Sequence, residues 1–244
     1  MAVDREQVFD DDYLYFYETW LTDEMSDRQS ELIWRLLELE PGMEVLDLAC
    51  GHGRIANRLA TRGAHVTGLD ATPLFLERAS ADAAARGVEV EYVEGDMRSL
   101  LWEERFDRVV CWFTSFGYFD DDDNGRVLAA VHRALKPAGR LLIDVHNLPG
   151  FIKLFRPTDV IERNGDFLID NAAFDQLSGR MKSERIMIRG GRTRRVAFEV
   201  REFTFTELRS WLVEAGFGAV DGYGRDGEPL TLDHPRMIVI ARKP

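Results

Sequence analysis

Apolar positions recur along the first part of the chain in two alternating patterns, one typical of helices and one typical of buried strands. Residues 26–38 have the helical spacing, and Pro41-Gly42 ends that helix. The runs that then predict strands are 44–49, 64–70, 88–95, 106–113 and 139–145. The runs that predict helices between them are 53–62, 72–86 and 121–136. This alternation predicts an α/β fold, a parallel sheet with helices on both faces.

The pattern changes after Asn147. Short β-type runs separated by Leu-Ser-Gly and Gly-Gly turns predict an antiparallel insertion of two or three hairpins. The α/β pattern then returns, with a helix at 205–215 and strands at 217–223 and 235–243. We therefore expect three parts: an N-terminal helical lid segment (1–40), an α/β domain (41–146 and 204–244), and a β-rich insertion that forms a substrate cap or an oligomer interface (147–203).

Composition and charge narrow the possible functions. No segment is apolar for the roughly 18 residues that a membrane span needs, and the acidic, aromatic start differs from a secretory signal. We therefore expect a soluble, cytoplasmic protein. The net charge of −12 disfavours binding to a phosphate backbone, so a small-molecule substrate is expected rather than nucleic acid. Cys50 and Cys111 lie far apart in apolar runs, which disfavours a disulfide or a cysteine metal site.

A strand runs into a glycine-rich turn and then into a helix at VLDLACGHGR, residues 45–54. Gly51 and Gly53 would let a ligand lie directly over the backbone, although they could also serve only a tight turn. Asp70 ends the next strand, about 17 residues beyond Gly53, where its carboxylate could accept both hydroxyls of a ribose or cap the following helix. Asp96 ends the third strand within reach of an exocyclic amine, and Met97 could cover an adenine face.

These motifs resemble those of class I S-adenosylmethionine-dependent methyltransferases. LDLACGHGR, LDAT, GDM and FDRVVCWFTSFGYF follow one another in the order and spacing of that family, over most of residues 44–145. The resemblance implies S-adenosylmethionine as cofactor, S-adenosylhomocysteine as product, and a Rossmann-like seven-stranded fold of strand order 3-2-1-4-5-7-6. It implies these cofactor contacts: Asp47, Ala49, Gly51 and Gly53 to the methionine part, Asp70 to the ribose, Asp96 and Met97 to the adenine, Trp112 beneath the cofactor, and Ala71 within the same cofactor site. A dinucleotide-binding oxidoreductase would share the glycine turn and Asp70, but it would not require Asp47 or the Asp96-Met97 pair.

His146 and Asn147 follow the fifth strand, at the edge where such sheets bind ligands. His146 could act as a general base or could simply bind backbone where the insertion begins. An amine acceptor needs only to arrive neutral, whereas an alcohol needs a base close to its proton, so a base at this place would favour O-methylation. The acidic run 120–123 is expected to start a helix rather than to bind a metal.

Aromatic residues and one arginine complete the predicted site. Phe116 and Tyr118 could form a wall that binds a cation, or could pack in the core. Tyr17 lies in a dense aromatic cluster that, by the resemblance, folds over the cofactor as a lid. Arg28 could pair with the cofactor carboxylate or form a surface ion pair.

The acidic aromatic start, the FTSFGYF segment and the β-rich insertion are similar to small-molecule methyltransferases, in particular the N-methyltransferases of secondary metabolism and of glycine. We therefore expect methyl transfer to a small molecule, to an amine nitrogen rather than an oxygen, in a setting such as antibiotic biosynthesis. The alternatives are a small-molecule O-methyltransferase and a non-catalytic S-adenosylmethionine-binding protein. The free edges of the insertion would suit a homo-oligomer.

Overall fold

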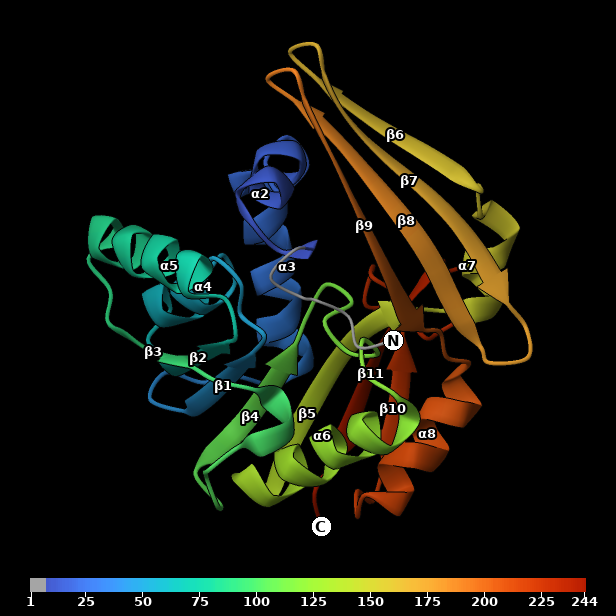
Figure 1. Ribbon diagram of the computed structural model, residues 1–244. Helices are drawn as coiled ribbons and strands as arrows, with labels where there is room; N and C mark the ends of the chain where they lie inside the picture. Colours follow the sequence, from blue (N-terminus) through green and yellow to red (C-terminus); the bar gives the residue numbers. More distant parts are fainter. Residues whose placement is uncertain (1–7) are drawn as a thin grey trace.

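The computed structural model describes residues 8–244, so residues 1–7 of the expected lid segment lie outside the described part. The larger sheet has seven strands in the order β10-β11-β5-β4-β1-β2-β3 (Figure 1). Their bounds are β1 Glu44–Leu48, β2 His65–Asp70, β3 Val90–Glu94, β4 Phe106–Cys111, β5 Leu135–His146, β10 Val220–Tyr223 and β11 Arg236–Arg242. β1 to β5 pair in parallel, whereas β11 runs antiparallel to both β5 and β10. Because β10 and β11 are the sixth and seventh strands of this sheet along the chain, the predicted order 3-2-1-4-5-7-6 is confirmed.

Helices cover both faces of this sheet, and each face has its own apolar core. Val45 packs on one face with Ile33 and Leu59, whereas its neighbour Leu46 packs on the other with Leu128, as the alternation of side chains along a strand requires. The helices are α2 Asp11–Tyr17, α3 Asp23–Leu36, α4 Ala56–Thr61, α5 Pro73–Arg86, the 3-10 helix η1 Met97–Ser99, α6 Asp121–Ala134, α7 Leu148–Leu154 and α8 Phe205–Glu214. None of the helices within residues 8–244 is both long and apolar enough to cross a bilayer.

Several boundaries differ from those expected from the pattern. α3 begins at Asp23 rather than at residue 26, because Thr22 caps it by accepting a hydrogen bond from the Met25 amide at 3.2 Å. α4 begins at Ala56 rather than at residue 53, since the preceding residues continue the glycine turn. β5 extends over residues 135–146 and follows α6 directly.

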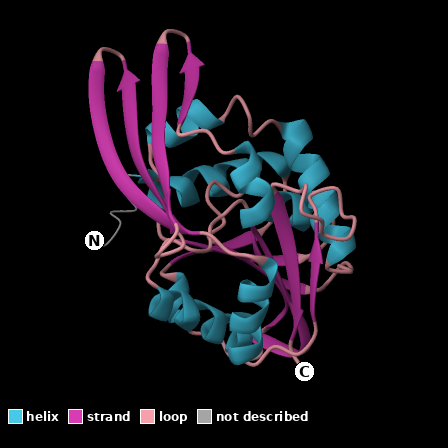
Figure 2. Ribbon diagram, turned by 90° about the vertical axis from the view of Figure 1, so that its right-hand side faces the viewer, coloured by secondary structure: helices cyan, strands magenta, loops and turns pink. Residues whose placement is uncertain are grey.

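The insertion begins with α7 and continues as a separate four-stranded antiparallel sheet that rises over the carboxyl edge of the larger sheet (Figures 1 and 2). Its strands, in the order β6-β7-β8-β9, are β6 Thr158–Arg163, β7 Asp166–Asp175, β8 Arg180–Arg189 and β9 Arg192–Arg201. Three consecutive hairpins join them, which agrees with the pattern of turns in the sequence.

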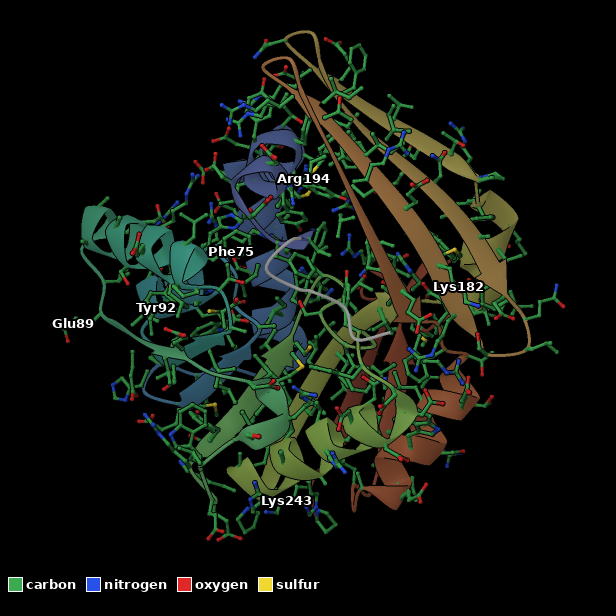
Figure 3. The ribbon with its side chains drawn as sticks, in the orientation of Figure 1. Phe75, Glu89, Tyr92, Lys182, Arg194 and Lys243 are labelled. Carbon is green, nitrogen blue, oxygen red and sulfur yellow. The ribbon has the colours of Figure 1, made fainter. Side chains whose placement is uncertain are left out.

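α2 packs against the insertion sheet. Its buried Phe16 joins an apolar cluster with Leu168 and Met187 from β7 and β8. The acidic start of the helix faces arginines of the same sheet: Arg189 Nη1 lies 2.9 Å from an Asp12 carboxylate oxygen. Arg194, labelled beside α2 in Figure 3, pairs with the acidic residues at the start of that helix. Apolar and ionic contacts together therefore hold α2 over the edge of the larger sheet.

Candidate active site

A cavity of about 760 Å³ lies between the carboxyl edge of the larger sheet, α2 and the insertion sheet. The part that we call the sheet-edge half is lined by the turn after β1 and the ends of β2 to β4, including Asp47, Ala49, Gly51, Asp70, Ala71, Met97 and Trp112. The part that we call the insertion half is lined by α2, the loop after β4, the end of β5 and the insertion, including Tyr17, Tyr118, His146, Arg185, Phe198 and Glu202. Most of the residues predicted from the sequence thus surround one cavity.

The turn after β1 shapes the wall of the sheet-edge half. Ala49, Gly51 and Gly53 have φ angles of 57°, 56° and 77°, in the left-handed region. A Cβ on Gly51 would be 3.9 Å from its nearest neighbour, Phe75 of α5, which also lines the cavity and is labelled in Figure 3. A Cβ on Gly53 would lie 2.8 Å from the Ala79 Cβ. Gly53 therefore allows α5 to pack against the turn and does not itself line the cavity.

Two buried polar atoms of opposite charge lie without hydrogen-bond partners in this half: Asp47 Oδ2 and Arg54 Nη2, among the described residues. Burial raises the pKa of Asp47 to about 7, although nearby Arg54 opposes the shift. Burial lowers the pKa of Arg54 to about 10, and its Nη1 donates to Gln29 Oε1 at 2.6 Å. A ligand that carries an ammonium and a carboxylate, as an amino acid does, would satisfy both atoms.

Asp70 is held rigidly at the end of β2. Its Oδ2 accepts from the Gly51 amide at 2.8 Å, and its Oδ1 accepts from the Thr72 amide at 2.9 Å. Burial raises its pKa above the ordinary value, and these amides oppose the shift. Each carboxylate oxygen has a second lone pair, so both can still accept a ligand hydroxyl.

Asp96 lies beside the cavity but not in its wall. Its carboxylate caps η1 by accepting from the Arg98 amide at 2.9 Å, and it forms a two-pronged ion pair with the Arg98 guanidinium, the shorter contact being 2.6 Å. The wall at this place consists of Gly95 and Met97. In the structure Asp96 therefore caps η1 and pairs with Arg98, and its contact with adenine stays a prediction.

The placement of Arg28 also departs from the prediction. Its side chain is 69% exposed, pairs with Glu24 at 3.1 Å and does not line the cavity. This corrects the expected carboxylate contact, because the exposed face of α3 directs Arg28 into solvent. Arg54, which the sequence analysis missed, lies in the place expected for that contact, and its position directly after Gly53 was the available signal.

His146 forms a pair with Glu202 in the insertion half. Its Nδ1 lies 3.1 Å from both carboxylate oxygens of Glu202, whose side chain is only 2% exposed. Its ring stacks on Phe151 of α7 at 4.2 Å. Glu202 could not be predicted from the sequence, because it follows β9 and lies 56 residues from its partner.

Asn147 and Phe116 have structural contacts instead of cavity contacts. The buried Asn147 amide donates to the carbonyl oxygens of Thr231 at 3.1 Å and His234 at 2.8 Å, and so holds the loop before β11. Phe116 is buried in the core and stacks on Phe203 at 5.6 Å. Neither residue lines the cavity, which corrects the expected substrate contacts of both.

Aromatic rings and a buried ion pair form the rest of the insertion half. Tyr17 stacks on Tyr13 at 4.3 Å, and Tyr118 stacks on Phe198 at 6.3 Å. Arg185, which the sequence analysis also missed, donates to Asp170 through two 2.7 Å hydrogen bonds and to the Tyr17 hydroxyl at 3.1 Å. This network connects α2 to β7 and β8 along one wall.

The acidic run 120–123 forms the N-terminal cap and first turn of α6, the role expected of a helix start. Asp120 Oδ1 accepts from the Asp123 amide at 2.8 Å, and Asp123 pairs with Arg98 and Arg126. Within residues 8–244, no group of three or more His, Cys, Asp or Glu side chains is arranged to hold a metal ion.

Comparison with known proteins agrees with this architecture. Residues 45–139 match the methyltransferase domain family. A protein of Geobacillus sp. (strain WCH70) named as a methyltransferase is 26% identical over 219 residues, which covers 86% of this chain and 89% of that protein. The fold is similar to that of the CcbJ methyltransferase from Streptomyces caelestis, with a TM-score of 0.77 at 21% identity over 89% of each chain. It is also similar to an S-adenosylmethionine-bound amino pentose methyltransferase from Micromonospora echinaspora, with a TM-score of 0.62 at 23% identity over 92% of each chain.

The strand order, the glycine turn and the family match together define the class. They indicate a class I S-adenosylmethionine-dependent methyltransferase, with residues 45–139 as the matched methyltransferase domain. Its cofactor is S-adenosylmethionine.

Proposed function

We propose that the enzyme methylates an amine nitrogen of a small molecule, and that this molecule is a secondary metabolite such as an antibiotic precursor. The observation that carries the proposal is that the insertion half of the cavity combines aromatic faces with the buried carboxylate of Glu202, a lining suited to a cation. One of the similar structures supports the setting, because it is an amino pentose methyltransferase involved in calicheamicin biosynthesis.

The sheet-edge half is proposed to hold the cofactor. Asp47 would accept from the ammonium of its methionine part, Arg54 would bind the carboxylate, and Asp70 would accept from the ribose hydroxyls. Met97 and Trp112 would cover the remaining apolar surface. When bound, S-adenosylmethionine supplies an electrophilic methyl group on a sulfonium, so the protein needs only to align the acceptor and remove its proton.

The insertion half is proposed to bind the acceptor. Tyr17, Tyr118 and Phe198 offer aromatic faces that attract a cation, and Glu202 adds a buried negative charge. His146 Nε2 makes no hydrogen bond to the described residues, so it is available to take the proton of an arriving ammonium. Glu202 then stabilises the resulting imidazolium through Nδ1–H.

A hydroxyl acceptor is the second candidate, because the same pair would serve it. An alcohol must lose its proton as it reacts, and a histidine oriented by a carboxylate is the usual base for that step. The negative charge of Glu202 and the aromatic faces favour the amine, since a neutral alcohol gains little from either.

Matched pairs of acceptors distinguish an amine substrate from a hydroxyl substrate. The enzyme would be incubated with S-adenosylmethionine and amino sugars, each paired with the sugar that bears a hydroxyl in place of the amine. S-adenosylhomocysteine formation would be followed, and the methylated atom assigned by NMR. We expect methylation of the amine and not of its hydroxyl partner, whereas methylation of the hydroxyl compounds would overturn the amine proposal.

The quaternary state and the cellular location remain proposals from the sequence alone. The free edges of the insertion sheet suit a homo-oligomer. Light scattering of the purified enzyme would test this assembly, and a monomer at working concentration would contradict it. Localisation of the tagged chain in its own cell would test the cytoplasmic assignment.

A further inference from the structure

The chain leaves β4 through two consecutive residues with a left-handed backbone. Phe113 has a φ angle of 64° and Thr114 a φ angle of 60°. This region is unfavourable for residues that carry a Cβ, and for a β-branched residue such as threonine it is exceptional. Both residues line the cavity, so surrounding contacts hold a strained turn at the site.

Asp144 of β5 binds both amides of this turn. The Phe113 amide donates to Asp144 Oδ2 at 3.0 Å, and the Thr114 amide donates to the Asp144 carbonyl oxygen at 2.9 Å. The Asp144 side chain is 0% exposed. One buried residue therefore determines where the turn begins and how it bends.

Two arginines keep the Asp144 carboxylate charged. Arg225 Nη2 lies 2.7 Å and Arg236 Nη2 2.9 Å from its Oδ2. Burial alone would raise the pKa of Asp144, but these two guanidiniums outweigh it and hold the pKa at about 2. Arg236 also donates to Thr114 Oγ1 at 2.6 Å, so this guanidinium binds the turn through the threonine side chain as well.

The turn connects the two halves of the cavity. Trp112 precedes it, and the Trp112 indole donates to Gln29 at 3.0 Å, which also accepts from Arg54. Tyr118 follows it and lines the insertion half. Arg236, which binds the turn, is also the register partner of His146 in the pairing of β11 with β5.

We propose that Asp144 is a positioning residue for methyl transfer: with Arg225 and Arg236 it holds the Phe113–Thr114 turn in its left-handed conformation, and so sets the cofactor groups against the acceptor groups. The proposal rests on the proposed function. Misplacement of reacting groups by about 1 Å can cost on the order of a hundredfold in rate, so a relaxed turn reduces turnover even when both ligands still bind.

Thr114→Gly tests the turn without removing a buried charge. Glycine adopts the left-handed region at no steric cost, which offsets the loss of the hydrogen bond from Arg236, so we expect the variant to stay folded while its turn becomes free to move. We expect kcat to fall about tenfold or more with the S-adenosylhomocysteine Kd unchanged within about threefold. Thr114→Ser, which keeps the hydroxyl, retains most of the activity.

Ala138→Gly is the matched control, because Ala138 also has a left-handed φ of 60° but is exposed and does not line the cavity. It should stay folded, as Thr114→Gly does, and match the wild type in kcat. An unchanged kcat in Thr114→Gly, or an equal loss in the control, would overturn the proposal.

Asp144→Asn adds a readout that does not depend on the acceptor. Hydrogen exchange at the amides of Phe113 and Thr114 should accelerate, and kcat should fall, while cofactor affinity changes little. Unchanged exchange and unchanged kcat in the folded variant would refute the positioning role. If the variant does not fold, the kcat of Thr114→Gly tests the same role. A wild-type enzyme that methylates no amine would refute the proposed acceptor instead, and the exchange measurement would still report on Asp144.

Discussion

Asp47 offers the sharpest test of the cofactor-binding groups, because its buried carboxyl group has one oxygen without a partner. Burial raises its pKa from 3.8 to about 7, against the opposing effect of Arg54. A rise of about 3 units corresponds to about 4 kcal/mol against the ionised form in the ligand-free protein. An ammonium placed beside the carboxylate would offset that cost, since it favours the ionised form.

The sign of the pH dependence follows from this shift. Because the folded-state pKa lies above the unfolded value, the unfolded chain releases this proton first, and stability of the ligand-free protein falls as pH rises from about 4 to about 7. Asp47→Asn has no proton to release. We therefore expect the variant to be more stable than the wild type at pH 8, by up to about 4 kcal/mol, while it binds S-adenosylhomocysteine more weakly.

Calorimetric titration with S-adenosylhomocysteine between about pH 5.5 and 7.5 measures how the protonation of Asp47 changes the affinity for the ligand. The wild-type affinity should fall towards tenfold per pH unit below about 7, as Asp47 becomes protonated, and Asp47→Asn should lose that slope. 5′-Methylthioadenosine, which lacks the ammonium and the carboxylate, is the control ligand and should bind independently of pH. A wild-type affinity without pH dependence, or an Asn variant with full affinity, would refute the reasoning.

Three further variants test other groups. Asp70→Ala should weaken S-adenosylhomocysteine binding by about tenfold or more, because the ribose hydroxyls lose their acceptor. An unchanged calorimetric Kd would contradict the role of Asp70 as the ribose acceptor. Arg54→Gln should weaken binding by a similar factor, whereas the matched control Arg28→Gln should bind as the wild type does; equal effects would contradict the proposed role of Arg54. Glu202→Gln should lower kcat by about tenfold to a hundredfold with the KM for S-adenosylmethionine unchanged, and steady-state rates equal to wild type would show that Glu202 does not assist His146.

The sheet-edge half could largely be predicted from the sequence, because its groups follow the ends of consecutive strands. In a parallel sheet those ends share one edge, so Asp47, Gly51 and Asp70 come together by topology alone. Asp96 shows the limit of this rule. A short polar side chain at a strand end can cap the next helix or pair with a nearby guanidinium, and the spacing of motifs does not decide between these partners.

The insertion half could not be predicted to the same degree. Its partners lie far apart in the chain, as with Glu202 and His146, and their meeting depends on how the antiparallel sheet sits over the larger one. Phe116 and Tyr118 are two residues apart in one loop, yet only Tyr118 reaches the cavity. Which ring turns inward depends on the path of the Phe113–Thr114 turn, and a left-handed turn without glycine leaves no signal in the sequence.

The position of β11 between β5 and β10 has a consequence for the order in which the enzyme is built. The hairpins of the insertion pair residues close in sequence, so they can form early, whereas Arg236 meets Asp144 across 92 residues. Until β11 has been synthesised and docked, β5 has an open edge and Asp144 lacks one of its two guanidinium partners. We therefore expect the part of the cavity that contains His146 to form last during folding. Methylating activity should then appear only after β11 has paired with β5.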